Sequence, residues 1–251
     1  MLQIFADISS MQDGMLAIGG EDYNHIRNVL RMHPGEKLAV RSESGGSEGY
    51  CFEIVSFTDS RVNCRLLSVE QAETELPVKV ILFQGLPKSD KMDLIVQKSV
   101  EMGVTQIVPV EMHRSIVKLA GDKRRKRVAR WQSIAEAAAK QSKRAIIPEV
   151  GDILTMEEAL RFAAASADAV FVPYERMSEE DETGTRVLIE SLQPGQTAAV
   201  FVGPEGGFEE SEIASALESG AKTISLGKRI LRTETAAMAF LAFLIYRFEL
   251  D

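Results

Sequence analysis

The sequence "TAAVFVGPEGGFEESEIASALESGAKTISLGKRILRTETA" occupies residues 197–236 and decides the fold. Within it, the apolar run Ala198 to Val202 breaks at a glycine-rich loop, and from Glu209 to Ser219 apolar residues recur at helical spacing. A second unit follows at once, because Thr223 to Leu226 is typical of a buried strand and an apolar helix begins at Thr235. The stretch therefore predicts two successive units, each made of a strand, a loop and a helix.

Both predicted strands end in a glycine-bearing loop that opens a helix. The first loop, Gly203 to Gly207, holds three glycines in five residues. The second loop, Lys228 to Thr233, directly follows Gly227 at the end of its strand and carries Arg229 and Arg232. In open parallel sheets, ligands bind beyond the carboxyl ends of the strands, where glycines let the backbone approach and helix starts offer free N–H groups. The first loop alone is equally well explained as an ordinary turn. Two such loops in one short segment favour a ligand cleft.

The segments "FVGPEGGF" and "LGKRILRTETA" together resemble the C-terminal signature of the SPOUT class of RNA methyltransferases, and closely that of the ribosomal RNA small subunit methyltransferase E family. The resemblance implies an α/β domain with a parallel sheet and a trefoil knot that binds S-adenosyl-L-methionine. It also implies a homodimer that methylates N3 of a specific uridine in small-subunit ribosomal RNA. It covers essentially the whole chain and is most specific in residues 197–240.

The resemblance also implies which residues form the site. The expected cofactor-binding residues, which act mainly through their backbone, are Val202, Gly203, Pro204, Glu205, Gly206, Gly207, Leu226, Gly227, Ile230, Leu231, Thr235 and Ala236. Arg232 is expected to stabilise the developing uracil anion, and Glu234 to orient Arg232 or to cap the helix. The segment "RTETA", residues 232–236, is also explained as a plain helix start capped by Thr233 or Thr235. No residue can be assigned as the general base.

Residues 1–72 are expected to form a PUA-like β-barrel that binds RNA, an assignment that the resemblance supplies. Short alternating runs predict strands at Gln3 to Ala6, Lys37 to Arg41, Tyr50 to Phe57 and Arg61 to Val69. A helix is predicted between the first two of these. On it, Arg27 and Arg31 lie four apart and are expected to contact RNA phosphate, although both are equally well explained as plain surface arginines.

Residues 73–251 are expected to form the methyltransferase domain. The run Val78 to Phe83 is apolar throughout, as in strands that are buried on both faces. Predicted helices and strands then alternate, which predicts a mainly parallel α/β sheet. The acidic segment Tyr174 to Thr185 is expected to be a loop or a helix start. The first strand is not followed by a G-x-G-x-x-G motif, which weakens an ordinary dinucleotide-binding assignment.

The chain carries a net charge of −8, yet its bases are concentrated in one segment. Between Arg114 and Arg144 there are eleven basic and two acidic residues, a net charge of +9, so the other residues carry −17. This asymmetry predicts a local anion-binding face. A solvated helix rich in lysine is the alternative. The expected RNA-binding residues of this segment are Arg114, Lys118, Lys123, Arg124, Arg127 and Arg144.

Several classes of protein are disfavoured by composition. Cys51 and Cys64 have no metal-binding spacing, and the three histidines are scattered, so no metal site is expected. The N-terminus does not resemble a signal peptide, and the longest apolar run, Ala236 to Tyr246, is too short to span a membrane. We therefore expect a cytoplasmic protein without a membrane partner. The helix at that apolar run would pack in the core or at a dimer interface.

Two further functions stay open at this point. One is a non-catalytic RNA-binding module associated with the ribosome, although such a module has no need of paired glycine loops. The other is a knotted methyltransferase that acts on transfer RNA. Both alternatives keep the fold but change the substrate or the chemistry.

Overall fold

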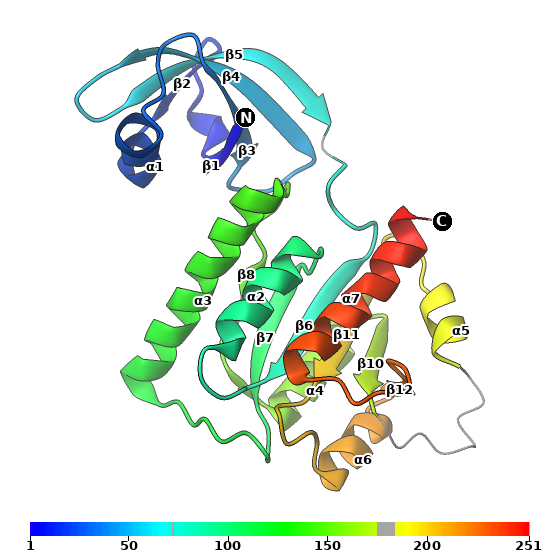
Figure 1. Cartoon of the computed structure of the whole chain (residues 1–251). Helices are drawn as coiled ribbons and strands as arrows, with labels where there is room; N and C mark the ends of the chain where they lie inside the picture. The colour runs from blue at the N-terminus through cyan, green and yellow to red at the C-terminus, as the bar shows by residue number, and fades with distance from the viewer. Residues whose placement is uncertain (72, 175–183, 251) are drawn as a thin grey trace. The chain divides into compact units, whose positions relative to one another are not determined.

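The structure is a computed structural model that describes residues 1–71, 73–174 and 184–250 (Figure 1). The chain divides into two compact units. The first comprises Met1–Glu75 and Ala139–Ile147, and the second comprises Leu76–Ala138 and Pro148–Asp251. The first unit therefore takes in a distant short segment that a single cut after residue 72 does not include. Most of the acidic segment after Tyr174 lies outside the described residues.

The first unit is built on a five-stranded sheet. Its strands are β1 (Leu2–Ala6), β2 (Met15–Ile18), β3 (Lys37–Ser42), β4 (Glu48–Phe57) and β5 (Val62–Gln71), in the order β1-β3-β4-β5-β2. The pair β1 and β3 is parallel, and the other pairs are antiparallel. A short helix η1 (Ile8–Ser10), helix α1 (Gly20–Asn24) and a π-helical turn η2 (His25–Val29) connect β1 to β3 around β2. The four predicted strands are present, and β2 is an addition.

The long strands of this sheet bend around a core. Register shifts between Cys51 and Phe52, and between Ile54 and Ser56, mark bulges in the pairing of β4 with β5. Bulges bend a strand and increase its twist, so the sheet can curl over its own apolar face. That face carries buried side chains from all five strands and from η2: Ile4, Leu16, Ile18, Ile26, Leu38, Val40, Phe52, Ile54, Val62 and Cys64.

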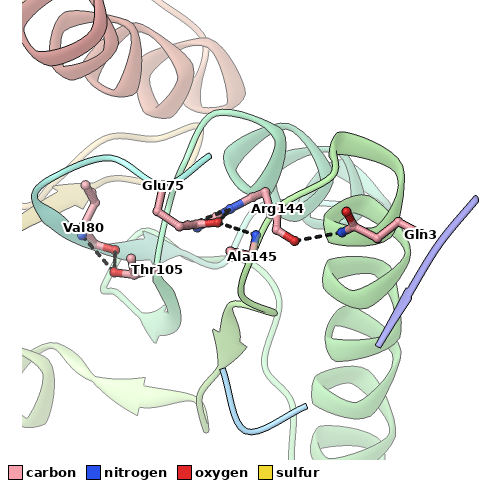
Figure 2. A network of polar contacts seen from close by, with 6 residues as sticks. All are labelled: Gln3, Glu75, Val80, Thr105, Arg144 and Ala145. Carbon is pink, nitrogen blue, oxygen red and sulfur yellow. Dashed lines mark hydrogen bonds and ion pairs between the residues drawn. The ribbon is translucent and has the colours of Figure 1, made fainter. Parts of the chain in front are cut away.

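The distant segment Ala139–Ile147 is held in the first unit by a buried ion pair (Figure 2). Only 2% of the Arg144 surface is exposed, and its guanidinium pairs with the Glu75 carboxylate. Glu75 also accepts a hydrogen bond from the Ala145 N–H at 2.8 Å, and Gln3 Nε2 donates to the Arg144 carbonyl oxygen at 2.8 Å. Glu75 thus pairs with the charge of this segment, and Glu75 and Gln3 both bind its backbone.

The second unit is built on a parallel sheet, as predicted. Its strands are β6 (Lys79–Gly85), β7 (Gln106–Glu111), β8 (Glu149–Val150), β9 (Leu154–Thr155), β10 (Ala169–Pro173), β11 (Thr197–Val202) and β12 (Lys222–Ile224). The order is β12-β10-β11-β6-β7-β8, with β9 also paired to β7, and every pair is parallel. At the start of β6, Thr105 Oγ1 accepts from the Val80 N–H at 2.9 Å and donates to its carbonyl oxygen at 2.8 Å (Figure 2).

Helices cover both faces of this sheet. They are α2 (Lys91–Glu101), α3 (Gly121–Ser142), α4 (Met156–Ser166), α5 (Thr185–Glu190), α6 (Glu210–Glu218) and α7 (Thr233–Glu249). Helices α4 and α6 share one apolar cluster with Phe83 and Phe201, whose rings stack at 4.4 Å. On the opposite face, Phe171 of β10 meets Phe240 of α7 at 5.7 Å, and α7 lies beside α2 (Figure 1). Within the described residues, no helix is both long and apolar enough to cross a membrane.

Local signals account for the start of α4 and the end of α2, but not for the start of α7. Helix α4 starts in a capping box formed by Thr155 and Glu158, and α2 stops before Gly103, whose φ of +94° favours glycine. Helix α7 begins at Thr233, two residues before the expected start, and its N-cap residue Arg232 makes no capping hydrogen bond through its side chain. Thr233 is therefore not the cap that a plain helix start would need, and its hydroxyl has another partner.

We predict that Glu75→Ala lowers the free energy of unfolding by about 3 kcal/mol, because it removes the carboxylate paired with a buried guanidinium. Urea denaturation measures the change. Glu53→Ala is the matched control, since its ion pair with Arg65 lies at the surface and should contribute less than about 1 kcal/mol. Equal losses in the two variants would contradict a special role for Glu75.

Candidate active site

A cavity of about 590 Å³ opens where β10, β11 and β12 end. The strands are parallel, so their carboxyl ends meet at one edge of the sheet. The volume lies in the range of small-molecule sites. The lining residues are Lys91, Arg114, Pro173, Tyr174, Val202, Gly203, Pro204, Glu205, Gly206, Gly207, Phe208, Glu210, Ser225, Leu226, Gly227, Arg229, Ile230, Leu231, Arg232, Thr233 and Ala236.

The structure brings the two predicted loops to the same cavity. Of the expected cofactor-binding residues, all except Thr235 line it, and so does Arg232. Glu234 does not belong to the lining, and its side chain is 14% exposed. The two loops thus line one cavity, whereas Glu234 lies outside its lining.

The first loop folds tightly because of its glycines. The Gly207 N–H donates to the Pro204 carbonyl oxygen at 2.9 Å, and Gly207 has a φ of +68°. A Cβ on Gly203 would lie 3.2 Å from the Gly207 backbone, and a Cβ on Gly85, at the end of β6, would lie 2.6 Å from Pro204. Larger residues at these positions would push the loop out of its place.

The second loop exposes its charges and one apolar side chain. Gly227 has a φ of +107°, and a Cβ there would meet no atom within 4 Å, so the backbone is open on that side. Arg229 and Arg232 are exposed, and Ile230 is 87% exposed. At the start of the loop, the Ser225 N–H donates to Thr185 Oγ1 at 2.7 Å, which ties the loop to α5.

A lysine that the sequence analysis missed joins the first loop to α7. Lys91, the first residue of α2, lies 3.0 Å from Glu205 and 3.6 Å from Glu234 and lines the cavity. Burial raises the pKa of Glu205, but hydrogen bonds from its own backbone, from Lys91 and from the Lys88 N–H, with the Lys91 charge, lower that pKa overall. Lys91 follows the end of β6 closely, so the strand-end rule could have found it.

Arg114 holds the first loop from the side of β7. Its Nε donates to Glu209 at 2.8 Å, and its Nη1 donates to the Gly206 carbonyl oxygen at 3.0 Å. The hydrogen bond and the charge of Glu209 raise the pKa of Arg114, and Arg114 lowers the pKa of Glu209 in the same way. The expected RNA contact is therefore also part of the cavity wall.

Other expected RNA-binding residues of the second unit lie at the surface. Lys118 and Lys123 are exposed, and the structure records no carboxylate within 4 Å of either among the described residues. Arg124 is partly buried, and Arg127 lies 3.8 Å from Asp90. These four residues come from α3 and the loop before it, and they remain candidates for contact with a polyanion.

Three expected RNA contacts belong to the first unit, and the structure corrects the expectation for each of them. Arg144 is wrong as a surface contact, because it is buried and paired with Glu75. Arg27 and Arg31 do not share a helical face, because the helical turn ends at Val29 and Arg31 has a left-handed φ of +53°. The guanidinium of Arg27 lies over the Phe57 ring, 4.8 Å from its centroid.

The cavity wall combines backbone, apolar and cationic groups. In the part of the chain that the structure describes, no group of three or more His, Cys, Asp and Glu side chains is arranged to hold a metal ion. The walls combine glycine backbone, apolar side chains such as Leu226 and Phe208, and cations at the second loop. Such a site can bind a nucleoside-like ligand by its backbone and place arginine beside a developing negative charge.

Comparison with known proteins shows matches over both units. Residues 74–245 match the model of an RNA methyltransferase domain, and residues 18–46 match that of an RNA methyltransferase PUA domain. The ribosomal RNA small subunit methyltransferase E of Bacillus subtilis (strain 168) is 37% identical over 235 residues, which are 93% of this chain and 91% of that protein. The protein of the same name from Mycobacterium bovis is 31% identical over 88% of this chain and 82% of its own.

A solved structure agrees with these matches. The ribosomal RNA small subunit methyltransferase E from Neisseria gonorrhoeae, solved bound to S-adenosyl methionine, superposes with a TM-score of 0.84 at 30% identity. The match covers 99% of this chain and 98% of that one. The chain thus agrees with these proteins in sequence and in fold along nearly its whole length, and its two loops line one cavity. This protein therefore belongs to the ribosomal RNA small subunit methyltransferase E family.

Proposed function

We propose that this protein transfers a methyl group from S-adenosyl-L-methionine to N3 of a specific uridine in small-subunit ribosomal RNA. The observation that carries the proposal is that both glycine-bearing loops line one cavity together with Arg232, in a chain of this family. A protein that only binds RNA has no need of such a cavity. The family relatives named for small-subunit ribosomal RNA favour that substrate over transfer RNA.

The residues present fit the proposed cofactor. The cavity volume suits a nucleoside-sized ligand, and Gly207 and Gly227 leave open space where a side chain would stand. We assign cofactor binding to the expected residues that line the cavity, which are Val202 to Gly207, Leu226, Gly227, Ile230, Leu231 and Ala236. Thr235 would act only indirectly, because it does not line the cavity. When bound, the cofactor supplies a methyl group activated by its sulfonium.

The protein's own task is then to orient the acceptor base and to stabilise its charge. N3 of uridine carries a proton at neutral pH, so the base becomes anionic as that proton leaves. Arg232 at the cavity wall would stabilise this charge. Glu234 would act through Lys91, since it reaches that ammonium at 3.6 Å from behind the wall. We therefore assign Arg232 a catalytic role and Glu234 a positioning role.

RNA is proposed to bind through two surfaces. In the methyltransferase domain, proposed as residues 73–251, Lys118, Lys123, Arg124 and Arg127 supply positive charge. In the PUA-like domain, proposed as residues 1–72, Arg27 and Arg31 remain candidates. These cations would contact phosphate, and the cavity would receive the unpaired or flipped base.

Three further properties are proposed from the family resemblance: a trefoil knot around the two loops, assembly as a homodimer, and a cytoplasmic location. The exposed Tyr246 on α7 is compatible with a partner surface on that helix. Size-exclusion chromatography with light scattering would measure the oligomeric state.

Calorimetry with S-adenosyl-L-methionine, followed by nucleoside mass spectrometry of ribosomal and transfer RNA from a deletion strain, tests the function. We expect binding of the cofactor and loss of N3-methyluridine from small-subunit ribosomal RNA alone. Absence of cofactor binding would favour a non-catalytic RNA-binding module. Loss of a nucleoside from transfer RNA alone would favour the other knotted methyltransferases.

We predict that Arg232→Ala lowers kcat about 100-fold, because it removes the charge beside the developing anion, while the affinity for S-adenosyl-L-methionine changes little. Single-turnover methylation of small subunits measures the rate, and calorimetry measures the affinity. Lys228→Ala is the matched control, since Lys228 belongs to the same exposed loop but not to the cavity lining. If both variants lost activity equally, a specific role for Arg232 would be rejected.

We predict that the double variant Lys118→Glu with Lys123→Glu weakens RNA binding and flattens its salt dependence, because each lost phosphate contact lowers the slope of log K against log salt by about 0.7 to 0.9. Filter binding at several salt concentrations measures both quantities. Lys222→Glu is the control. Lys222 is an exposed lysine at the amino end of β12, whereas the cavity lies at the carboxyl ends of the strands. A slope unchanged in the double variant would remove these lysines from the RNA surface.

A further inference from the structure

A chain of buried hydrogen bonds links three segments next to the cavity. Gln84 lies near the end of β6, Gly203 directly follows β11, and Thr233 begins α7. Gln84 is 0% exposed and Thr233 is 5% exposed. Gln84 Nε2 donates to Thr233 Oγ1 at 2.8 Å, and Thr233 Oγ1 donates to the Gly203 carbonyl oxygen at 2.7 Å. The two residues thereby connect the first loop to the end of the second.

The direction of these bonds is fixed by their partners. Gln84 Nε2 also donates to the Gly85 carbonyl oxygen at 2.9 Å and faces the Val202 carbonyl oxygen at 3.5 Å. Carbonyl oxygens only accept, so the amide must present its nitrogen to them. The Thr233 hydroxyl must then accept from Gln84, because its own proton goes to Gly203. Gln84 therefore acts as the donor, and Thr233 both accepts and donates, so an apolar residue of the same size cannot replace either one.

Burying the Gln84 amide is unfavourable, and an apolar side chain at this position would avoid that loss of stability. Gln84 Oε1 is buried and has no hydrogen-bond partner among the described residues. An unsatisfied buried acceptor costs about 1–3 kcal/mol. Unsatisfied buried groups in a native structure call for an explanation. A role at a functional site would explain why Gln84 is buried here rather than an apolar residue.

We propose that Gln84 and Thr233 are positioning residues that hold the two glycine-bearing loops at a fixed spacing. The proposal rests on the proposed function, because it supposes that one ligand contacts both loops. Thr233 follows Arg232 directly and itself lines the cavity, and Gly203 opens the first loop. A ligand that spans loops already held in place loses less free energy to ordering them.

Loss of a positioning contact should affect two ligands of different length unequally, whereas a general loss of stability should affect both alike. S-adenosylhomocysteine carries both the nucleoside and the amino-acid part of the cofactor, whereas 5′-methylthioadenosine lacks the amino-acid part. A ligand that reaches both loops depends on their spacing, and a ligand that reaches fewer groups depends on it less. Loss of the hydrogen-bond chain should therefore weaken the longer ligand more than the shorter one.

The experiment compares Thr233→Val, which keeps the shape and loses the hydroxyl, with Thr233→Ser, which keeps the hydroxyl. We expect Thr233→Val to weaken S-adenosylhomocysteine about tenfold, as for the loss of about 1.4 kcal/mol, and to weaken 5′-methylthioadenosine much less. Thr233→Ser should retain the wild-type ratio of the two dissociation constants. Calorimetry at a temperature well below each variant's midpoint of thermal unfolding gives both constants.

Two further variants protect the interpretation. Gln84→Met removes the amide donor at nearly constant size and should reproduce Thr233→Val, which covers the case in which one variant fails to fold. Ser99→Ala removes a buried hydroxyl of α2 that has no hydrogen-bond partner in the described chain, so it should change neither constant. Equal weakening of both ligands in Thr233→Val, or no weakening, would overturn the proposal. A wild-type protein that binds neither ligand would instead reject the proposed function, and the positioning role with it.

Discussion

The parallel pairing of β6, β10, β11 and β12 is the constraint on which the rest of the second unit depends. Parallel strands must all finish at one edge, and each must be followed by a crossover that returns the chain to the opposite edge. Loops that are distant in sequence therefore meet in space, and contacts such as that of Thr233 with Gly203 then join them. The cavity, the arginines and the buried chain from Gln84 to Gly203 all lie at this edge because the hydrogen bonding of the strands brings them there.

The same constraint makes the site a product of backbone more than of side chains. Glycines at 203, 206 and 207 make room for a tight turn, while Gly85 lets the end of β6 pass close to Pro204. Charged side chains then hold the first loop, since Arg114 donates to the Gly206 carbonyl oxygen and Lys91 pairs with the Glu205 carboxylate. The cations that line the cavity therefore differ in character, because Arg114 and Lys91 are bonded to the first loop, whereas Arg232 is exposed.

Sequence patterns predicted the sheet and the two loops because these depend on local periodicity and on glycine. The run Val78 to Phe83 could be recognised as doubly buried from its composition alone. Arg144 was misplaced because charge composition cannot tell a solvated arginine from one that meets Glu75, a partner 69 residues away. Gln84 was missed for the same reason, since its role comes from a contact with a segment more than a hundred residues later. Lys91 could have been found from its place shortly after the end of β6, but its partners Glu205 and Glu234 could not. The start of α7 was misjudged because Thr233 bonds to Gly203 rather than to its own helix.

The short segment Ala139–Ile147 has a practical consequence for dissecting the molecule. A fragment ending at Glu75 would contain every strand of the first sheet and still lack a piece that the intact unit folds around. Its Glu75 and Gln3 would face water in place of Arg144 and its backbone. Neither unit can therefore be excised as one uninterrupted stretch of gene, and a swap of either unit between homologous enzymes needs three splice points, after Glu75, Ala138 and Ile147.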